Sequence, residues 1–297
     1  MYDKSDPRAA LKNQSGKKAE PTEFADSKHV KMYESTPQVS DSGTKTWWAR
    51  GQNFYLSYSE ASDGETFERK GQVDEYVVLF PDKSSEAVVK WDNQTVDVNG
   101  FSLVVVPKGD SEIIINKGGR VVRLFTVQNQ DLAEYPINKG AYNQADPNVA
   151  PFQPWPESPQ GSKVRVYSLD IPKEEGRFGR IFRCSTFMVN FLYPFEGPRE
   201  KLSPHFHDDF EQCSLLLEGE FVHHLRWPWT PDKAQWRPDE HEHCLAPSVT
   251  IMPAGVIHTS EPVGPNVNQL VDIFCPPRMD FSNQPGWVLN DDDYPLK

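Results

Sequence analysis

Histidines concentrate in one part of the chain, because seven of the eight lie between residues 205 and 258. His205 and His207 precede an apolar run, and residues two apart in a strand face the same side. Glu211 keeps the same parity if the strand is regular, and His258 follows the sequence PAG at the start of another apolar run. Three imidazoles and one carboxylate suit a first-row transition metal. A ligand set without thiolates argues against a closed structural zinc site.

The remaining histidines in this region are weaker candidates. His223 and His224 are adjacent, so a strand points them to opposite faces, and at most one of them faces the same cavity as the metal ligands. We take His224 as the candidate catalytic histidine, with a structural role as the alternative for both. His241 and His243 lie in the acidic stretch PDEHEH, which reads as a loop or an edge strand, and we do not place them in the site.

Short strands must position these side chains. Runs such as FSLVVVP and RVVRLFTV are bounded by Gly, Pro, Asp and Asn, and helical periodicity is absent. This pattern of short apolar runs bounded by turn residues is typical of an antiparallel sandwich or barrel. The predicted organisation is a polar arm over residues 1–45, a strand-rich segment over 46–128, a linker with six prolines over 129–162, a second strand-rich segment over 163–276 and a polar tail over 277–297.

The two strand-rich segments contain an internal repeat. SLVVVPKGDSEIIIN resembles SVTIMPAGVIHTSEP, and each is preceded by an acidic residue before an apolar run. Glu75 lies 32 residues before Pro107, and Glu211 lies 42 residues before Pro253. The sequence therefore predicts two copies of one barrel.

The second copy resembles a known family. PHFHDDFEQCSLLLEGE resembles the first cupin motif, with Gly219 one place later than usual, and MPAGVIH resembles the second. Pro247 stands where the second motif has a glycine, and its terminal Asn is absent. The resemblance implies an all-β chain of two jelly-roll-like cupin β-barrels, a bicupin. It also implies a metal held by the following ligands: His205, His207, Glu211 and His258.

The first copy departs from the metal-binding pattern. Aligning Glu75 with Glu211 puts Arg69 and Gly71 at the two positions of the H-x-H pair, and Glu112 falls at the position of the last histidine. No histidine remains among these positions. We expect this barrel to hold no transition metal and to support folding and packing.

Composition limits the partners. The formal net charge is −12, which is unfavourable for binding nucleic-acid phosphates or an anionic membrane surface. No N-terminal run resembles a secretory signal. The four cysteines form no CxxC pair, so reduced thiols in a cytoplasmic protein are expected, and we expect a homodimer.

The function indicated is a metal-dependent, dioxygenase-like oxidoreductase that acts on a small oxygenated or carboxylated organic molecule. One divalent transition metal per chain is expected, Fe or Mn first and Ni or Zn as alternatives, with Glu211 as a possible base. A Lewis-acid isomerase or lyase and a non-catalytic binding protein remain open alternatives. The expected cavity lining includes Cys213, Leu215 and one of the paired histidines, with Phe206 or Trp227 near the rim.

Overall fold

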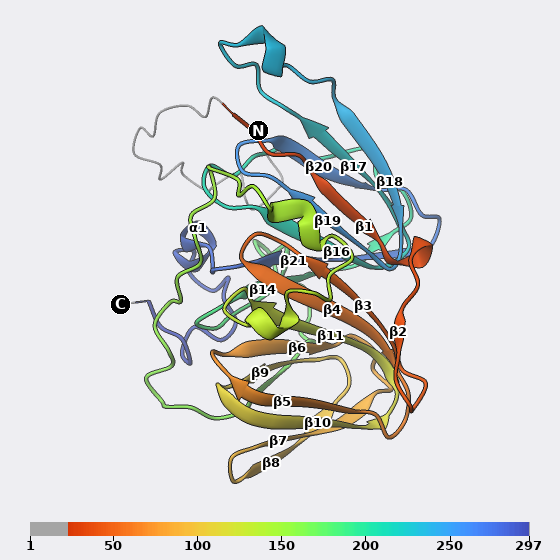
Figure 1. The fold of residues 1–297 in the computed structure, drawn as a ribbon, viewed down its shortest axis with the longest axis vertical. Helices are drawn as coiled ribbons and strands as arrows, with labels where there is room; N and C mark the ends of the chain where they lie inside the picture. Colours follow the sequence, from red (N-terminus) through yellow and green to blue (C-terminus); the bar gives the residue numbers. More distant parts are fainter. Residues whose placement is uncertain (1–22, 297) are drawn as a thin grey trace.

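The computed structural model describes residues 23–296, and strands dominate it. Two β-barrels follow each other along the long axis of the molecule, the N-terminal barrel at one end and the C-terminal barrel at the other (Figure 1). The predicted all-β class is confirmed. Within the described part of the chain, no helix is long and apolar enough to cross a membrane.

The N-terminal barrel consists of a large sheet and a four-stranded sheet that runs β5-β10-β7-β8. Alternate residues of the large sheet, such as Val78 and Val104, are buried between the two sheets. Its strands are β2 (Gln38–Val39), β3 (Lys45–Arg50), β4 (Phe54–Ala61), β5 (Thr66–Gln72), β6 (Tyr76–Phe80), β7 (Glu86–Trp91), β8 (Gln94–Asn99), β9 (Ser102–Val106), β10 (Gly109–Lys117) and β11 (Gly119–Thr126).

The C-terminal barrel repeats this arrangement, with a large sheet that faces the three-stranded sheet β18-β17-β20. Its strands are β13 (Gly179–Arg183), β14 (Met188–Leu192), β15 (Phe195–Glu196), β16 (Gln212–Glu218), β17 (Glu220–Arg226), β18 (Glu240–Leu245), β19 (Ser248–Met252), β20 (Ile257–Pro262) and β21 (Val267–Phe274). The β17–β18 hairpin extends beyond the barrel at the top of Figure 1.

The two barrels exchange edge strands. The strand β1 (Lys28–Lys31), which precedes the N-terminal barrel, pairs with β19 of the C-terminal barrel. The strand β12 (Arg165–Ser168), which precedes the C-terminal barrel, pairs with β9 of the N-terminal barrel. The limits of the two barrels in the structure therefore differ from the starts at residues 46 and 163 that the sequence predicts. Residues 1–22 of the predicted arm lie outside the described residues.

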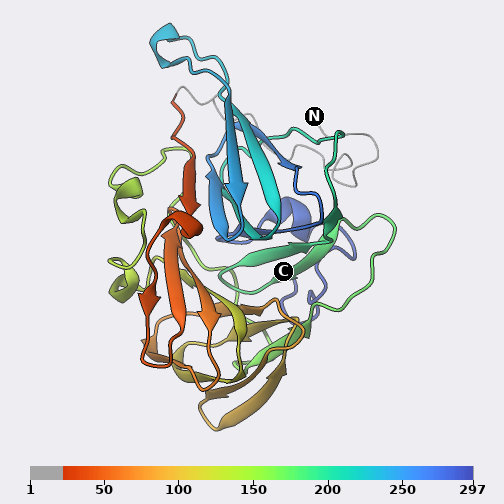
Figure 2. The same ribbon diagram turned by 90° about the vertical axis from the view of Figure 1, so that its right-hand side faces the viewer.

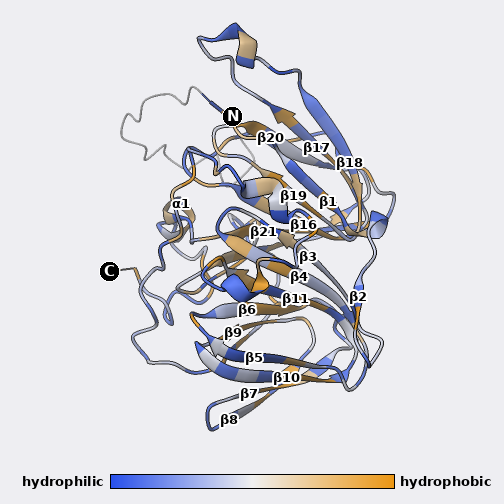
Figure 3. Ribbon diagram, in the orientation of Figure 1, coloured by the Kyte–Doolittle hydropathy of each residue, from blue (hydrophilic) through white to orange (hydrophobic). Residues whose placement is uncertain are grey.

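A shared core joins the barrels. Odd-numbered residues of β16, Cys213, Leu215 and Leu217, belong to one cluster with Leu56 and Val77 of the N-terminal barrel. Along the strands, apolar and polar residues alternate in Figure 3, as expected where one face of a sheet is buried differently from the other. The even-numbered residues of β16 consequently face the interior of the C-terminal barrel.

The connecting segments pack on this two-barrel body. The linker contains the 3-10 turns η3 (Gln130–Leu132) and η4 (Lys139–Tyr142), and it runs along the side of both barrels in Figure 2. The remaining short elements are the 3-10 turns η2 (Met32–Glu34) and η5 (Lys233–Gln235) and the α-helix α1 (Met279–Ser282). The predicted linker thus lies along the surface of the molecule.

Candidate metal centre

Three of the four expected ligands come together. His205, His207 and His258 are buried, and one ring nitrogen of each lies within 4.8 Å of those of the other two. The ring centroids are 4.6 Å apart for His205 and His258 and 5.1 Å apart for His207 and His258. Neutral imidazole nitrogens at this separation can ligate one ion.

Backbone pairing fixes the position of the triad. His205 and His258 form an isolated antiparallel bridge, with N–H to C=O bonds of 3.0 and 2.7 Å in the two directions. Gly255 N donates to His207 O over 2.6 Å. The loop that carries the H-x-H pair is therefore tied to the start of β20, where the third histidine stands.

Hydrogen bonds also orient two of the rings. His205 Nδ1 donates to Ser203 O over 2.8 Å, and His258 Nδ1 donates to Val256 O over 2.9 Å. In a neutral imidazole the proton on Nδ1 leaves the lone pair on Nε2. This is the usual way in which a second partner prepares a histidine to bind a metal through its other nitrogen.

Glu211 does not join the histidines. Its carboxylate accepts a hydrogen bond of 2.5 Å from Gln52 N and one of 2.8 Å from the Tyr142 hydroxyl, both from the N-terminal half of the chain. Burial raises the pKa of Glu211 to about 7. The expected common parity fails because residues 208–211 are not part of a regular strand, which begins only at Gln212.

Gln212 lies where the carboxylate was expected. Its Oε1 accepts a hydrogen bond of 2.9 Å from His207 Nε2, and its Nε2 donates to Asp272 Oδ1 and Ser214 Oγ over 3.1 Å each. Gln212 was not among the predicted site residues. The late position of Gly219 was the available signal, since counting back from this glycine moves the motif's acidic position from residue 211 to residue 212.

His207 is held in its neutral form. Desolvation lowers the pKa of His207 well below its usual value, and the positive charge of Arg278 contributes in the same direction. Arg278 itself packs on Phe281 and pairs with Asp280. A deprotonated imidazole is the form that binds metals, so this environment favours ligation near neutral pH.

A row of polar side chains crosses the inner face of the large sheet beside Gln212. The strand registers place its members directly opposite one another, from β14 to β1: Asn190, Asp272, Ser214, Thr250 and His29. Ser214 Oγ donates to Asp272 over 2.9 Å, and His29 Nδ1 lies 3.1 Å from Thr250 Oγ1. Such a row is unusual in an interior that otherwise consists of apolar residues such as Leu216 and Leu270.

Asn190 is the member of this row whose side-chain polar atoms are least satisfied by hydrogen bonds. Its side chain is fully buried, and within residues 23–296 neither its Oδ1 nor its Nδ2 has a hydrogen-bond partner. A buried amide left in this state costs about 1–3 kcal/mol for each unmade bond. Gly179 provides the space for it, because a Cβ at that position would overlap the amide.

The adjacent histidines point to opposite faces, as a regular strand requires, but the histidine that faces inward is not the one we predicted. His223 is fully buried, its Nδ1 lies 2.8 Å from Ser260 Oγ, and burial lowers its pKa to about 3. His224 lies on the outer face and contacts His241 and Glu261 at 2.6 and 2.8 Å. The structure therefore does not bring His224 to the triad, and His223 is the member of the pair that faces inward.

Other expected lining residues are also elsewhere. Cys213 and Leu215 pack in the shared core between the barrels, because odd residues of β16 face that side. Trp227 packs against Phe24, and Phe206 is half exposed. His243 is exposed and pairs with Glu220, which agrees with leaving it out of the site.

Solved structures with a similar fold cover most of the chain. An oxalate decarboxylase from Lactobacillus farciminis in complex with formate superposes with a TM-score of 0.58 at 13% identity, over 84% of this chain and 86% of that one. AerE from Microcystis aeruginosa gives 0.55 at 9% identity, over 86% and 99%. A single-substitution variant of the Bacillus subtilis oxalate decarboxylase gives 0.58 at 12% identity, over 92% and 82%.

The chain has the bicupin fold. The predicted fold and the internal repeat are thereby confirmed. At the level of sequence, neither protein-family models nor curated proteins match the chain.

The N-terminal barrel of this bicupin contains no histidine cluster among the described residues. Arg69 pairs with Asp131 at 2.6 Å, and Glu112 contacts Lys90 at 3.3 Å. Glu75 is buried and accepts hydrogen bonds from Ser185 N, Ser185 Oγ and the Tyr294 hydroxyl. These residues are thus used in other contacts.

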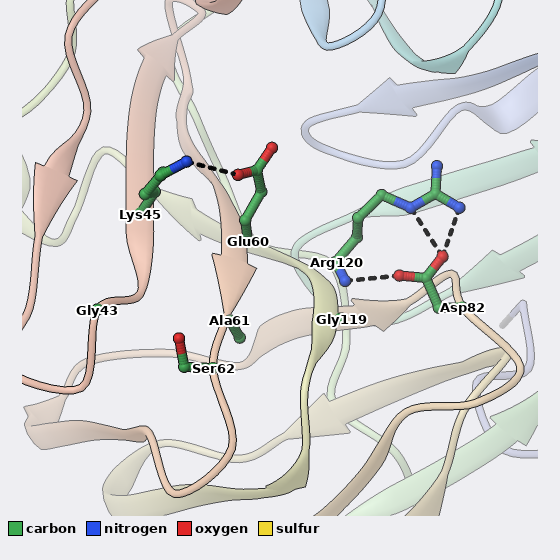
Figure 4. Close-up of a pocket in the computed structure, with 8 residues that line it drawn as sticks. All are labelled: Gly43, Lys45, Glu60, Ala61, Ser62, Asp82, Gly119 and Arg120. Carbon is green, nitrogen blue, oxygen red and sulfur yellow. Dashed lines mark hydrogen bonds and ion pairs between the residues drawn. The ribbon is translucent and has the colours of Figure 1, made fainter.

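A surface hollow at the edge of the N-terminal barrel is separate from the triad. Figure 4 shows its lining, in which Lys45 faces Glu60 and Arg120 binds Asp82 through both its backbone N–H and its guanidinium. Because its charged side chains are paired with each other, this hollow offers little to a charged ligand.

Proposed function

We propose that this bicupin is an enzyme that binds one divalent transition metal in its C-terminal barrel and acts there on a small carboxylated organic molecule. The observation that carries the proposal is the convergence of His205, His207 and His258 with their Nδ1 or Nε2 atoms already bound by neighbouring groups. Fe and Mn remain the first candidates. Mn is supported by the Mn(II) centres of the B. subtilis oxalate decarboxylase.

The ligand set favours an anionic substrate. Imidazole binds metals in its neutral form, and the amide of Gln212 stands at the motif position where a carboxylate would have supplied a negative charge. A divalent ion in this set keeps its full charge, so a carboxylate substrate is attracted to it more strongly than a neutral one. When bound, the metal supplies Lewis acidity and, for Fe or Mn, redox chemistry.

The side chains around the triad have separate roles in this proposal. Asp272 orients Gln212 through the 3.1 Å hydrogen bond from the amide, and Gln212 in turn orients His207. Asn190 and His223 offer polar atoms to the polar part of a substrate inside the barrel. Glu211 is bound by Gln52 and Tyr142, so its proposed role as a base has no support from its position.

A dioxygenase reaction is the first reaction class we propose. Three imidazole ligands leave positions on a six-coordinate ion for both a substrate and dioxygen. A lyase reaction is the second candidate, supported by the likeness of the fold to oxalate decarboxylases.

One experiment separates the two classes. Protein loaded with Fe(II) or with Mn(II) is incubated anaerobically and aerobically with a panel of small mono- and dicarboxylates, while dioxygen uptake and released CO2 are measured. Turnover that consumes dioxygen supports the dioxygenase, and anaerobic release of CO2 supports the lyase. Turnover in neither atmosphere, with carboxylates bound at the metal, would replace the enzyme by a non-catalytic binding protein.

A further inference from the structure

The interior of the N-terminal barrel contains a positive charge without a counter-charge. Arg123 of β11 is 7% exposed. Within residues 23–296 its guanidinium donates one hydrogen bond, from Nε to Ser57 Oγ over 3.1 Å, and it forms no ion pair. An unpaired buried charge is strongly destabilising, so its presence in an otherwise apolar interior needs a reason.

Aromatic rings surround the guanidinium without neutralising it. Its Cζ lies 4.1 Å from the ring centroid of Phe67, 5.4 Å from that of Trp48 and 5.9 Å from that of Phe125. Cation–π attraction offsets part of the desolvation, but ring faces accept no more than a weak contact from the N–H groups at the edge of the fork. The N–H groups of the Arg123 guanidinium are therefore still able to bind an anion.

Neighbouring charged groups do not serve as the missing partner. Arg69 adds a further positive charge and is itself paired with Asp131. Glu65 accepts hydrogen bonds from Ser40 and Ser42 instead. Among the described residues, neither Arg69 nor Glu65 therefore neutralises the Arg123 guanidinium with an ion pair.

The two barrels carry opposite charges at the same register position. Arg123 lies opposite Val78 of β6, and Asp272 lies opposite Ser214 of β16. Val78 and Ser214 follow Glu75 and Glu211 at equal distances in the chain, so Arg123 is the counterpart of Asp272. In the C-terminal barrel this position belongs to the polar row beside the triad.

From this geometry we propose that the N-terminal barrel binds a small monocarboxylate at Arg123, with the carboxylate on the guanidinium fork and the apolar part against the surrounding rings. The planar fork matches the two oxygens of a carboxylate, and the charge-assisted bonds are strong in an apolar site. The aromatic side chains of Trp48 and Phe67 provide a surface for a short hydrocarbon portion. The site uses no metal and does not depend on the function proposed for the C-terminal barrel.

Acetate is the probe for this site. Titration calorimetry is performed with metal-free full-length protein in EDTA, at constant ionic strength set with sodium chloride, on the wild type and on Arg123→Met, Arg123→Lys and Arg226→Met. Arg226 is an exposed arginine paired with Asp239, so its variant controls for the loss of one positive charge. A His207→Ala background removes any contribution from the histidine triad.

The expected result is one acetate per chain for the wild type, Arg226→Met and His207→Ala proteins. Binding is lost in Arg123→Met and at least ~10-fold weaker in Arg123→Lys, which lacks the fork. Saturating acetate raises the Tm of the wild type by about 3 °C, and ligand-free Arg123→Met melts no lower than the wild type because it removes an uncompensated charge. Absence of acetate binding to the wild type, or equal binding to Arg123→Met, overturns the proposal. A cation–π cluster with a purely structural role would instead lower the Tm of Arg123→Met.

Discussion

Glu211 and Gln212 are adjacent in the chain but serve different parts of the molecule. The Glu211 carboxylate is bound by Gln52 and Tyr142 in the contact with the N-terminal half, whereas Gln212 Oε1 lies 2.9 Å from His207 Nε2 inside the barrel. Glu75, at the start of β6, likewise reaches Ser185 and Tyr294 from the C-terminal half. Each barrel therefore uses its acidic residue to contact the other, and the metal site receives an amide.

Metal affinity should depend on Gln212. The Gln212→Glu variant adds a negative charge to a set of neutral donors, so it should bind Fe(II) or Mn(II) about 10–100-fold more tightly than the wild type. Gln212→Leu should bind more weakly by a similar factor. Competition with a fluorescent chelator measures both. Glu211→Gln serves as the control and should leave the affinity unchanged, and a larger effect at residue 211 than at residue 212 would reverse the assignment.

Stability should depend on pH through Glu211. Its pKa in the folded protein, about 7, is raised above the ordinary value of 4.5, so the folded state favours the protonated form. The resulting stabilisation is complete below pH ~4.5 and is lost as the pH rises to ~7, and it amounts to about 3 kcal/mol. The lowered pKa values of His207 and His223 act in the opposite sense, since the unfolded state takes up protons at these histidines first as the pH falls.

Glu211→Gln isolates this contribution, because both proteins share the histidines. Urea denaturation at several pH values should show the variant gaining stability relative to the wild type between pH ~5 and ~8. A difference in the free energy of unfolding that stays constant over this range would contradict a titrating Glu211.

Asn190 should lower the stability of the folded protein and contribute to the binding of a small carboxylate. Replacing this uncompensated amide by Leu, which has a similar volume, should raise the free energy of unfolding by about 1–2 kcal/mol. The same variant should weaken binding of a small carboxylate to the metal-loaded protein and leave the metal affinity unaltered. Thermal denaturation and calorimetry measure the two effects. A destabilised variant with normal carboxylate binding would assign Asn190 a structural role.

The sequence was sufficient for the fold, and three of the four ligands predicted from it lie close together in the structure. The periodicity of short apolar runs and the repeat around Pro107 and Pro253 predict two barrels, and the H-x-H pair and His258 are held together by a backbone bridge that is consistent with strand alternation. Glu211 was misplaced because parity counting assumes a regular strand through residues 208–211, where the chain is irregular.

Contacts between segments that lie far apart in the sequence could not be predicted from the local residue pattern. The exchange of β1 and β12 between barrels depends on how two sheet edges meet, and nothing in the local pattern of KHVK or RVYS identifies their partners. The choice between His223 and His224 depends on the register of β17 against β20, which one residue of shift would reverse.

The central claim is a single metal held by the histidine triad of the C-terminal barrel. Elemental analysis of purified protein after loading and removal of free metal tests it most directly, with His207→Ala as the test variant and His224→Ala as a control on the outer face. We predict one transition-metal ion per chain in the wild type and His224→Ala proteins and a loss of most of it in His207→Ala. An unchanged metal content in His207→Ala, or two tightly bound ions per chain, would contradict the account.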